Sequence, residues 1–576
     1  MEYSGARILI ETLIEQGVDT VFGYPGGSVL FIYDELYKHS DRIRHILVSH
    51  EQHAAHAADG YARSTGKTGV CIATSGPGAT NLVTGIATAY MDSVPLVAIT
   101  GNVATNLLGK DSFQEVDIAG ITMPVVKHNW IVKDTAELAE VVREAFIVAN
   151  SGRPGPVLID ILKDITSNTA EWTPAGASTG NGAEGAAGRA RRLLERSARR
   201  TFSGADIERA VMMIREAKHP FIYAGGGVVS SDACDELKNF AERVNAPVAL
   251  TLMALGALDS GHPLYTGMIG MHGTVASNKA VQKSDLLITI GARFSDRVTS
   301  RTDIFAKNAK VLQFDIDPAE INKNVRASFG ITGNVKLILR QIMEALSAGG
   351  GPLGARETAD SWHEDIALWK TQIPKSHHRE TKLHPRFIIE ETGKRLGPES
   401  IAVTDVGQHQ MWVAQFYPHK RPRAFLSSGG LGTMGFGLGA AIGAKTANPD
   451  RPVVLMTGDG SFRMNCAELS TVVAYNIPVL VIVFNNGTLG MVRQWQNLFY
   501  DGRYSETTLD RPPDFVKLAE AYGVRAYRAT DENGFTTALE AAVTGGKSAL
   551  IDSVIDIDEM VLPMVPGGSP VDEQLL

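Results

Sequence analysis

Short apolar runs alternate with amphipathic helical stretches along the whole chain, and glycine, proline or a polar turn closes most of the runs. Runs of this kind are typical of strands that are buried on both faces of a parallel sheet. Strand, turn and helix in repetition predict an α/β fold of doubly wound parallel sheets, with ligands beyond the carboxyl ends of the strands. In the first third of the chain we expect strands at Thr20–Tyr24, Ile43–Ser49, Thr68–Ser75 and Pro95–Thr100.

The same pattern recurs twice, so the 576 residues are expected to form three domains rather than one oversized core. Further strands are predicted at Pro220–Ala224, Pro247–Leu252, Leu286–Ile290 and Val311–Asp315, and then at Ile401–Asp405, Val453–Thr457 and Val479–Phe484. Stretches rich in Ala, Gly and Ser indicate the connections. We predict a first domain over 1–166, a linker over 167–204 with an Arg-rich half, a central domain over 205–346, a linker over 347–378, a third domain over 379–560, and a tail or lid rather than a packed element over 561–576.

Composition narrows the class of protein. A formal net charge of −8 argues against a nucleic-acid partner. The start of the chain has no signal-peptide pattern, and no apolar stretch is long enough to span a bilayer. Three dispersed cysteines (Cys71, Cys234, Cys466) indicate neither a disulfide framework nor a zinc site. A cytoplasmic protein without membrane contact is therefore expected.

The strongest chemical pattern lies between Pro452 and Asn486. The run Val453–Thr457 is a predicted strand that ends in Gly458-Asp459-Gly460, and the next strand ends at Asn485-Asn486. Because consecutive parallel strands end at one edge, Asp459 and Asn486 are expected to converge there. Hard oxygen ligands beside a substrate diphosphate suit Mg²⁺, and glycines let backbone amides approach phosphate. Either fragment alone is more simply a turn; the pair favours a metal site.

This unit resembles the thiamine-diphosphate motif, which begins with Gly-Asp-Gly and closes with Asn-Asn. The resemblance implies that Asp459, Asn486 and the backbone oxygen of Thr488 hold Mg²⁺, with Gly460, Ser461 and Gly490 at the cofactor.

A thiamine enzyme also needs a carboxyl group that hydrogen-bonds the aminopyrimidine and so promotes loss of the C2 proton. Glu51 is the candidate, because it stands where the run Ile43–Ser49 gives way to a helix. A carboxylate that stabilises a helix N-terminus is the simpler interpretation of that position alone.

Longer stretches resemble the catalytic large subunit of acetohydroxyacid synthase (acetolactate synthase). They run in order from near residue 5 to near residue 566 and comprise His50–Arg63, Thr74–Asn81, Val406–Trp412, Gly429–Gly435, Gly490–Trp495 and Pro563–Pro566. The connector from Thr166 to Ser203 departs from that pattern. The resemblance implies three doubly wound domains: a pyrimidine-binding domain, a central Rossmann-like domain for FAD, and a diphosphate-binding domain.

The resemblance also implies roles for single residues. Glu51 would activate the pyrimidine, Met434 would support the bent cofactor, and Gly432 would contact its ring. Gly407, Gln408 and His409 would hold diphosphate oxygens. Arg293 would meet the carboxylate of the second ketoacid, a task suited to a forked guanidinium. The substrate cleft would be lined by Gly27, Phe113, Gln114, Lys163, Met491 and Trp495.

In the central domain Gly225-Gly226-Gly227 follows a predicted strand, but no full GxGxxG follows it. FAD is therefore an implication of the resemblance and not of a fingerprint. The matching positions are Arg153, Gly225, Gly226, Gly227, Thr251, Leu252, Met271, His272, Gly273, Gly291, Ala292, Arg293, Arg297, Asp315, Ile316, Gly333 and Asn334.

The expected reaction decarboxylates pyruvate and joins the two-carbon fragment to pyruvate or 2-ketobutyrate, giving 2-acetolactate or 2-aceto-2-hydroxybutyrate. This is the first common step of branched-chain amino acid biosynthesis. Trp495 is expected to favour the larger acceptor by about 1–3 kcal/mol. Implied partners are a second copy of the chain, as a homodimer or homotetramer with interfacial active sites, and a small regulatory subunit.

Three alternatives remain open at this point. One is a flavin-dependent pyruvate oxidase, another is a simple 2-ketoacid decarboxylase, and the third is a non-catalytic flavin- or nucleotide-binding protein that uses the central domain alone. The last leaves Glu51 and the Asp459/Asn486 pair without a task. The Glu51 carboxylate argues against glyoxylate carboligase, which has an apolar residue there.

Overall fold

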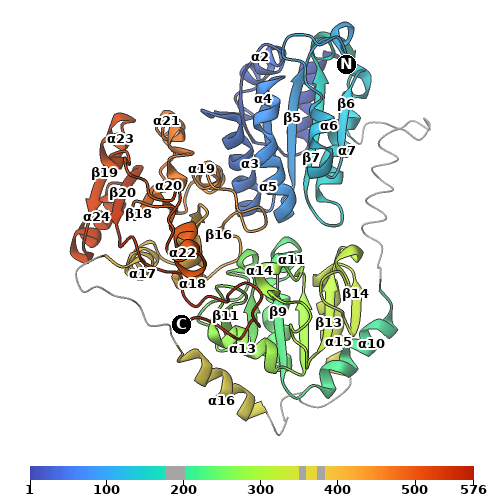
Figure 1. Ribbon diagram of the computed structural model, residues 1–576. Helices are drawn as coiled ribbons and strands as arrows, with labels where there is room; N and C mark the ends of the chain where they lie inside the picture. Colours follow the sequence, from blue (N-terminus) through green and yellow to red (C-terminus); the bar gives the residue numbers. More distant parts are fainter. Residues whose placement is uncertain (176–201, 349–358, 373–382) are drawn as a thin grey trace.

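The computed structural model describes residues 1–175, 202–348, 359–372 and 383–576. They form three α/β domains, each with a six-stranded parallel sheet and flanking helices (Figure 1). The predicted fold class is therefore confirmed. Within these described ranges, none of the helices has both the length and the apolar character needed to cross a membrane.

The first domain carries a sheet with the strand order β3-β2-β4-β5-β7-β6. All four strands predicted for this region are present, and β6 and β7 extend the sheet. A short antiparallel pair, β1 (Glu2–Ser4) with β8 (Thr169–Glu171), joins the beginning of the domain to its end. The other elements are α1 (Gly5–Glu15), β2 (Thr20–Tyr24), α2 (Leu30–Lys38), β3 (Arg44–Leu47), α3 (Glu51–Thr65), β4 (Gly69–Ala73), α4 (Pro77–Asn81), α5 (Val83–Asp92), β5 (Leu96–Asn102), α6 (Ile118–Thr122), β6 (Asn129–Val132), α7 (Leu138–Asn150), β7 (Pro156–Leu162) and α8 (Lys163–Ser167).

The central domain has the strand order β11-β10-β9-β12-β13-β14. Its helix α10 begins at a capping box, in which Ser203 and Asp206 bond each other's backbone N–H. The elements are α10 (Gly204–Glu216), β9 (Pro220–Ala224), α11 (Gly226–Ser230), α12 (Cys234–Val244), β10 (Val248–Leu250), β11 (Tyr265–Met268), α13 (Val275–Lys283), β12 (Leu286–Ile290), α14 (Asp296–Thr299), β13 (Lys310–Asp315), β14 (Phe329–Thr332), α15 (Val335–Ala348) and α16 (Ala359–Lys370).

The third domain has the strand order β16-β15-β17-β18-β20-β19. The strands β17 and β18, which precede Asp459 and Asn486, are parallel neighbours. The elements are α17 (Pro385–Leu396), β15 (Ile401–Thr404), α18 (Gln408–Phe416), β16 (Phe425–Leu426), α19 (Gly437–Ala447), β17 (Val453–Gly458), α20 (Asp459–Phe462), a 3-10 turn η6 (Cys466–Glu468), α21 (Leu469–Ala474), β18 (Leu480–Asn485), α22 (Gly490–Phe499), α23 (Phe515–Ala521), β19 (Arg525–Ala529), α24 (Glu532–Thr544) and β20 (Ala549–Val554).

Each sheet has a switch point from which the chain adds strands in opposite directions, and in the first and third sheets the last two strands are also exchanged, as β7-β6 and β20-β19. The switch point falls between β2 and β4 in the first domain, between β9 and β12 in the central domain, and between β15 and β17 in the third. Ligands of doubly wound sheets bind in the crevice at such a switch point. The predicted ligand positions Gly27, Gly225, Gly291, Gly407 and Asp459 each follow one of these six strands, at or near its carboxyl end.

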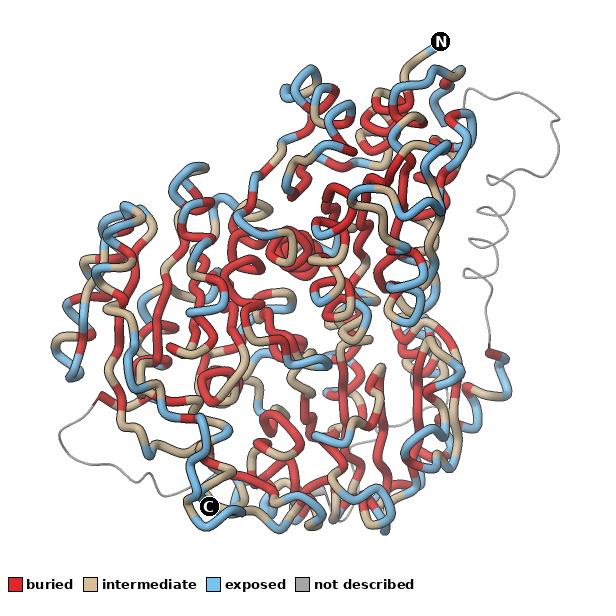
Figure 2. The backbone as a smooth tube through the Cα atoms, turned by 45° about the horizontal axis from the view of Figure 1, so that its top comes forward, coloured by how far each residue is buried: buried red, intermediate tan, exposed pale blue. Residues whose placement is uncertain are grey.

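The first and third domains share one hydrophobic core. Buried side chains of both sheets belong to a single cluster, which is continuous through α3 and α19. The two helices approach closely at glycines: a Cβ on Gly443 would overlap the carbonyl oxygen of Ala57, and one on Gly60 would overlap that of Ala440. Figure 2 shows buried backbone running through the middle of the molecule, with exposed positions toward its rim. The central domain has two cores of its own.

Two segments expected to be connections or a tail are packed instead. Helix α16 falls inside the 347–378 linker, yet Trp362 and Ile366 are buried in a central-domain core, and the Trp362 indole donates to Pro220 O at 3.2 Å. In the C-terminal segment Val565 and Val571 join the same core, so the expectation of an unpacked tail or lid was wrong. Apolar side chains spaced between prolines and glycines gave no periodic signal that would have indicated this packing. The Arg-rich stretch 189–200 lies outside the described residues.

The close approach of α3 and α19 makes Gly443 sensitive to substitution. Gly443→Ala is expected to force the helices apart and to lower the free energy of unfolding by about 1–3 kcal/mol. The measurement is the midpoint of thermal unfolding by circular dichroism. Gly204→Ala is the matched control, because no atom lies within 4 Å of the added methyl at the start of α10; an equal loss in both variants would contradict the role of this contact.

Candidate active site

The predicted metal-site residues meet at the carboxyl edge of β17 and β18. Asp459 is buried; its Oδ1 accepts from Gly460 N and its Oδ2 from Gly487 N, both at 2.9 Å. The Asn486 amide oxygen accepts from Thr488 N at 3.2 Å, and its nitrogen donates to Gln408 Oε1 at 3.3 Å. Burial raises the pKa of Asp459 to about 7, so a nearby cation would stabilise its charged form. The oxygen-bearing side chains of Asp459 and Asn486 and the tight turn at Gly487 thus lie together at one corner of the third domain, which we call the metal corner.

The metal corner suits a metal ion that is coordinated partly by the protein and partly by a bound diphosphate. Among the described residues no three His, Cys, Asp or Glu side chains gather as a metal site. One carboxylate, one amide oxygen and a backbone oxygen leave several positions of an octahedral Mg²⁺ to diphosphate and water. Thr488 is fixed for this task because its hydroxyl donates to Thr507 O at 2.7 Å.

The walls of the corner come from the start of α18. A Cβ on Gly490 would overlap Gln408 Oε1, and one on Gly458 would lie 2.9 Å from His409 Nδ1. His409 Nε2 is buried without a hydrogen-bond partner, and burial lowers the pKa of this imidazole to about 3. In the tautomer that carries its proton on Nε2, this neutral imidazole could donate to a diphosphate oxygen beside the close-packed glycines. Ser461 lies in the same corner and donates to Val406 O at 2.9 Å.

Glu51 stands at the carboxyl edge of the first sheet. It is the first residue of α3, and its Oε2 accepts from Asn81 Nδ2 at 2.9 Å. A Cβ on Gly78 would lie 3.3 Å from Glu51 Oε1, so glycine keeps this face of the carboxylate open. The side chain is half-buried. A carboxyl group with one oxygen fixed and the other accessible can hydrogen-bond a ligand.

The other first-domain candidates occupy the same edge. Gly27 follows β2 with open space around its Cα, and Lys163 follows β7 with an exposed side chain. Gln114 has a positive φ of 60° and lies against Gly76, while its neighbour Phe113 is 88% exposed. An aromatic ring this exposed is unusual in a binding site unless a ligand or a second chain covers it.

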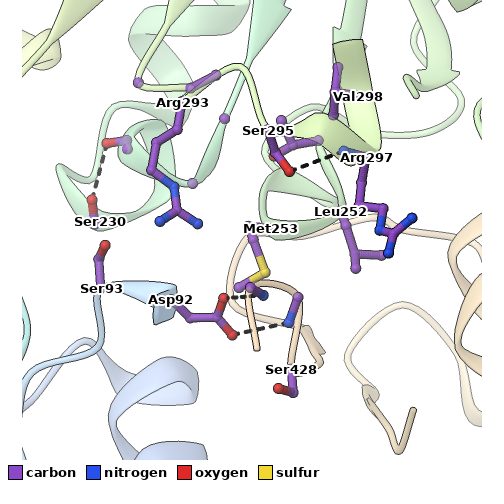
Figure 3. A pocket seen from close by; sticks show the side chains of 18 of the residues that line it. Asp92, Ser93, Ser230, Leu252, Met253, Arg293, Ser295, Arg297, Val298 and Ser428 are labelled. Carbon is purple, nitrogen blue, oxygen red and sulfur yellow. Dashed lines mark hydrogen bonds between the residues drawn. The ribbon is translucent and has the colours of Figure 1, made fainter. Parts of the chain in front are cut away.

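A cavity of about 740 Å³ lies between the three domains, within the size range of small-molecule sites. Figure 3 shows part of its wall, with Arg293 extending toward the side that carries Asp92 and Ser93. Many predicted residues line it: Arg153, Gly225, Gly226, Gly227, Thr251, Leu252, Met271, His272, Gly291, Ala292, Arg293, Arg297, Asp315, Ile316, Asn334, Gly407, Gly432, Met491 and Trp495. Gly273 and Gly333 do not, although Gly333 N donates to Asp315 O at 2.8 Å.

The structure separates the predicted residues into two groups. None of Gly27, Glu51, Phe113, Gln114 and Lys163 is among the residues that line this cavity. Met434 also lies outside the lining; its Cε is 3.9 Å from the position of a Cβ on Gly460, beside the metal corner. Of the residues predicted to hold the metal and the diphosphate, only Gly407 lines this cavity, so both the pyrimidine edge and the corner at Asp459 and Asn486 lie outside its wall.

The cavity wall contains buried polar atoms without hydrogen-bond partners, and an arginine that forms no ion pair with the described residues. Thr251 Oγ1 and Glu320 Oε2 are buried without hydrogen-bond partners. Burial raises the pKa of Asp315 to about 6. Arg153 pairs with Glu320 at 3.3 Å, whereas Arg293 pairs with none of the described carboxylates. A large ligand with a ribose or amide donor and an anionic group fits this wall, and FAD has both.

Two of the three glycines after β9 have a structural task that the sequence did not reveal. A Cβ on Gly225 would overlap Gly291 O, and one on Gly227 would lie 2.7 Å from Gly291 Cα. Gly225 and Gly227 are required by the contact between the loops after β9 and β12, whereas a Cβ on Gly226 would meet only Met253, at 3.2 Å. Their presence alone is therefore no sign of a phosphate.

Asp92 is a wall residue that sequence reasoning missed. Its carboxylate accepts from Gly430 N at 2.7 Å and Gly429 N at 3.1 Å, the bonds drawn in Figure 3, and from Arg63 at 2.9 Å. It fixes the loop that leads to Gly432. The last residue of a helix in a distant domain carries no local motif that would have indicated this role.

Comparison with known proteins identifies the class of enzyme to which this chain belongs. Models of the N-terminal TPP-binding, central and C-terminal TPP-binding domains of thiamine pyrophosphate enzymes match residues 3–121, 207–342 and 405–553. The chain belongs to the thiamine pyrophosphate enzymes, as its motifs predicted.

Within that class the chain is similar to acetolactate synthase large subunits. It is 46% identical to the one from Corynebacterium glutamicum, over 98% of this chain and 89% of the relative. For Parasynechococcus marenigrum the identity is 47% over 98% and 90%, and for Cyanidium caldarium 44% over 99% and 96%. The similarity thus spans nearly the whole chain.

Proposed function

We propose that this chain is the catalytic large subunit of an acetolactate synthase. The observation that best supports thiamine chemistry is the position of Asp459 and Asn486 at adjacent strand ends. Glu51 lies at the corresponding edge of the first sheet. The synthase reaction is supported by relatives named acetolactate synthase large subunit, which match nearly end to end. The reaction joins two molecules of pyruvate into 2-acetolactate and releases carbon dioxide.

Bound thiamine diphosphate supplies an electron sink for decarboxylation and carbon–carbon bond formation. Asp459, Asn486 and Thr488 O would hold Mg²⁺, and Gln408, His409 and Ser461 would surround the diphosphate. Glu51 would hold a proton at the pyrimidine nitrogen. Apolar Met491 and Trp495 would limit water in the cleft, which favours loss of a charged carboxylate.

Arg293 would bind the carboxylate of the acceptor ketoacid. Its guanidinium is half-buried, free of ion pairs with described residues and directed into the cavity (Figure 3). Arg297 lies over the Trp495 ring at 6.0 Å and would hold this ring beside the acceptor. The acceptor would be pyruvate or 2-ketobutyrate.

FAD would occupy the remainder of the cavity. The unpaired Thr251 hydroxyl and the Asp315 carboxyl offer contacts to its polar groups. The synthase reaction involves no net oxidation, so the flavin would be a bound component rather than a redox partner.

The active site would form between two copies of the chain. Exposed apolar side chains border both halves: Leu30, Phe31, Phe113 and Met123 in the first domain, and Met464, Phe499 and Tyr500 in the third. Apposition of two chains would bury them and bring Glu51 of one chain to the metal corner of the other. The word "large" in the relatives' names further implies a smaller regulatory subunit.

Product analysis tests this function. Purified protein with thiamine diphosphate, Mg²⁺ and FAD is expected to convert pyruvate to 2-acetolactate, with 2-aceto-2-hydroxybutyrate appearing when 2-ketobutyrate is added. The flavin absorbance should stay unbleached. Acetyl phosphate or acetate with flavin reduction would assign a pyruvate oxidase instead, and acetaldehyde alone would assign a decarboxylase.

A further inference from the structure

A buried carboxylate of the third domain holds the turn that carries Glu51. Glu468 has no exposed side-chain surface. Its Oε1 accepts from Ser49 N at 2.9 Å and from His50 N at 3.1 Å. These are the two backbone amides immediately before Glu51. No local motif indicates this contact, which spans more than four hundred positions.

The Glu468 carboxylate also accepts hydrogen bonds from two side chains. His53 Nδ1 donates to Glu468 Oε1 at 3.0 Å, and the Thr471 hydroxyl donates to Oε2 at 2.7 Å. His53 is one helical half-turn beyond Glu51 on α3. Glu468 therefore contacts the chain on both sides of Glu51. An anion at this position also suits the positive N-terminal end of α3.

Further bonds join the two segments. Tyr475 OH accepts from Leu47 N at 2.9 Å, and the Thr471 hydroxyl also lies 3.1 Å from Leu47 O. The Ser49 and Ser470 hydroxyls are 2.7 Å apart. The end of β3 and the start of α3 are thus fixed from outside their own domain.

The segment just before Glu468 is itself held in place by hydrogen bonds to a buried carboxylate, that of Asp405. Three residues before Glu468, Asn465 donates to Asp405 Oδ2 at 2.9 Å, and Asp405 also accepts from Gly435 N and Gly437 N at 2.8 and 3.1 Å. Asp405 is fully buried. Buried hydrogen bonds therefore hold the segment that precedes Glu468, which gives its carboxylate a fixed position from which to hold the turn before Glu51.

We propose that Glu468 is a positioning residue for Glu51, acting on the glutamate of its own chain. This inference rests on the proposed function, since it takes Glu51 as the group that activates the pyrimidine. Because Glu51 of one chain would serve a cofactor held by the other, Glu468 controls the active site to which its own chain gives the glutamate. It does not control the site to which its own chain gives Asp459.

Glu468→Gln keeps the shape of the side chain and replaces an accepting oxygen by a donor. We expect the rate of hydrogen–deuterium exchange at C2 of bound thiamine diphosphate to fall about ten- to a hundredfold, as small misplacements of a catalytic group do. The dissociation constant of thiamine diphosphate should stay within about twofold, because the metal corner is untouched. Ser470→Ala is the matched control: it removes a bond at the same junction but none to the amides of residues 49 and 50.

Mixed dimers, made from two differently tagged chains, separate positioning from general damage. In the first, one chain carries Glu468→Gln with Glu51→Gln and the other is unaltered; its activity should equal that of the dimer with Glu51→Gln alone on one chain. In the second, one chain carries Glu468→Gln with Asp459→Ala; its activity should fall about ten- to a hundredfold below that of the dimer with Asp459→Ala alone.

The opposite pattern, with loss in the first dimer only, would mean that Glu468 acts through its own metal loop and would overturn the proposal. Equal loss in both dimers, or no loss in either, would also overturn it. A further dimer tests the shared active site separately: Glu51→Gln on one chain and Asp459→Ala on the other should leave one intact site. Complete inactivity there would refute the interfacial arrangement itself, whatever Glu468 does.

Discussion

Replacing Glu51 by glutamine is expected to slow deuterium exchange at C2 of bound thiamine diphosphate by about 10²–10⁴-fold, the usual contribution of a placed acid or base. The amide cannot deliver a carboxyl proton to the pyrimidine, although it preserves the bond to Asn81. Exchange is measured by acid quench and proton NMR, and synthase turnover should fall in parallel. Cofactor affinity should change little, because the metal corner lies on another domain.

Glu532→Gln is the control for that experiment. Glu532 begins α24 as Glu51 begins α3, but it is exposed and remote from the strand ends of the site. Its substitution should leave exchange and turnover unaltered. If Glu51→Gln exchanged at the unaltered rate, the pyrimidine-activating group would have to be sought elsewhere.

Asp459→Ala is expected to weaken Mg²⁺-dependent binding of thiamine diphosphate by more than about 100-fold, since loss of even an outer partner of a metal ligand costs 10–100-fold. The substitution removes the carboxylate that is predicted to bind the metal and frees Gly487 N. Titration of the apoprotein at fixed Mg²⁺, followed by fluorescence quenching, gives the dissociation constant. Asp450→Ala, in an exposed turn, is the control. Retained affinity in the Asp459 variant would remove this residue from the metal site.

Much of the fold was predictable because buried parallel strands are short, apolar and closed by turns. The strands β2, β9 and β12 have the predicted limits. By contrast β19 carries two arginines at a sheet edge, and β20 contains Asp552, which is buried against Asn485 and Arg528. Polar residues that are neutralised by tertiary partners mask the apolar run on which such a prediction depends.

The candidate site was predictable where topology alone brings residues together. Strand ends of one sheet share an edge, so the sequence alone predicts that Asp459 and Asn486 meet. Glu468 and Asp92 were not, since each lies in or beside a helix and has its partners in another domain. The Gly225–Gly227 run could not be interpreted from the sequence alone, because close contact between two backbones requires glycine as strictly as the approach of a phosphate does.

The core shared by the first and third domains has a consequence for biosynthesis. Roughly 370 residues lie between α3 and α19, the two helices that complete it. At about 5–20 residues per second, a ribosome takes roughly 20–70 s to make that interval. During this time the face of α3 that carries Ala57 and Gly60 lacks its partner α19, so the nascent protein is a natural client for chaperones that cover apolar surface.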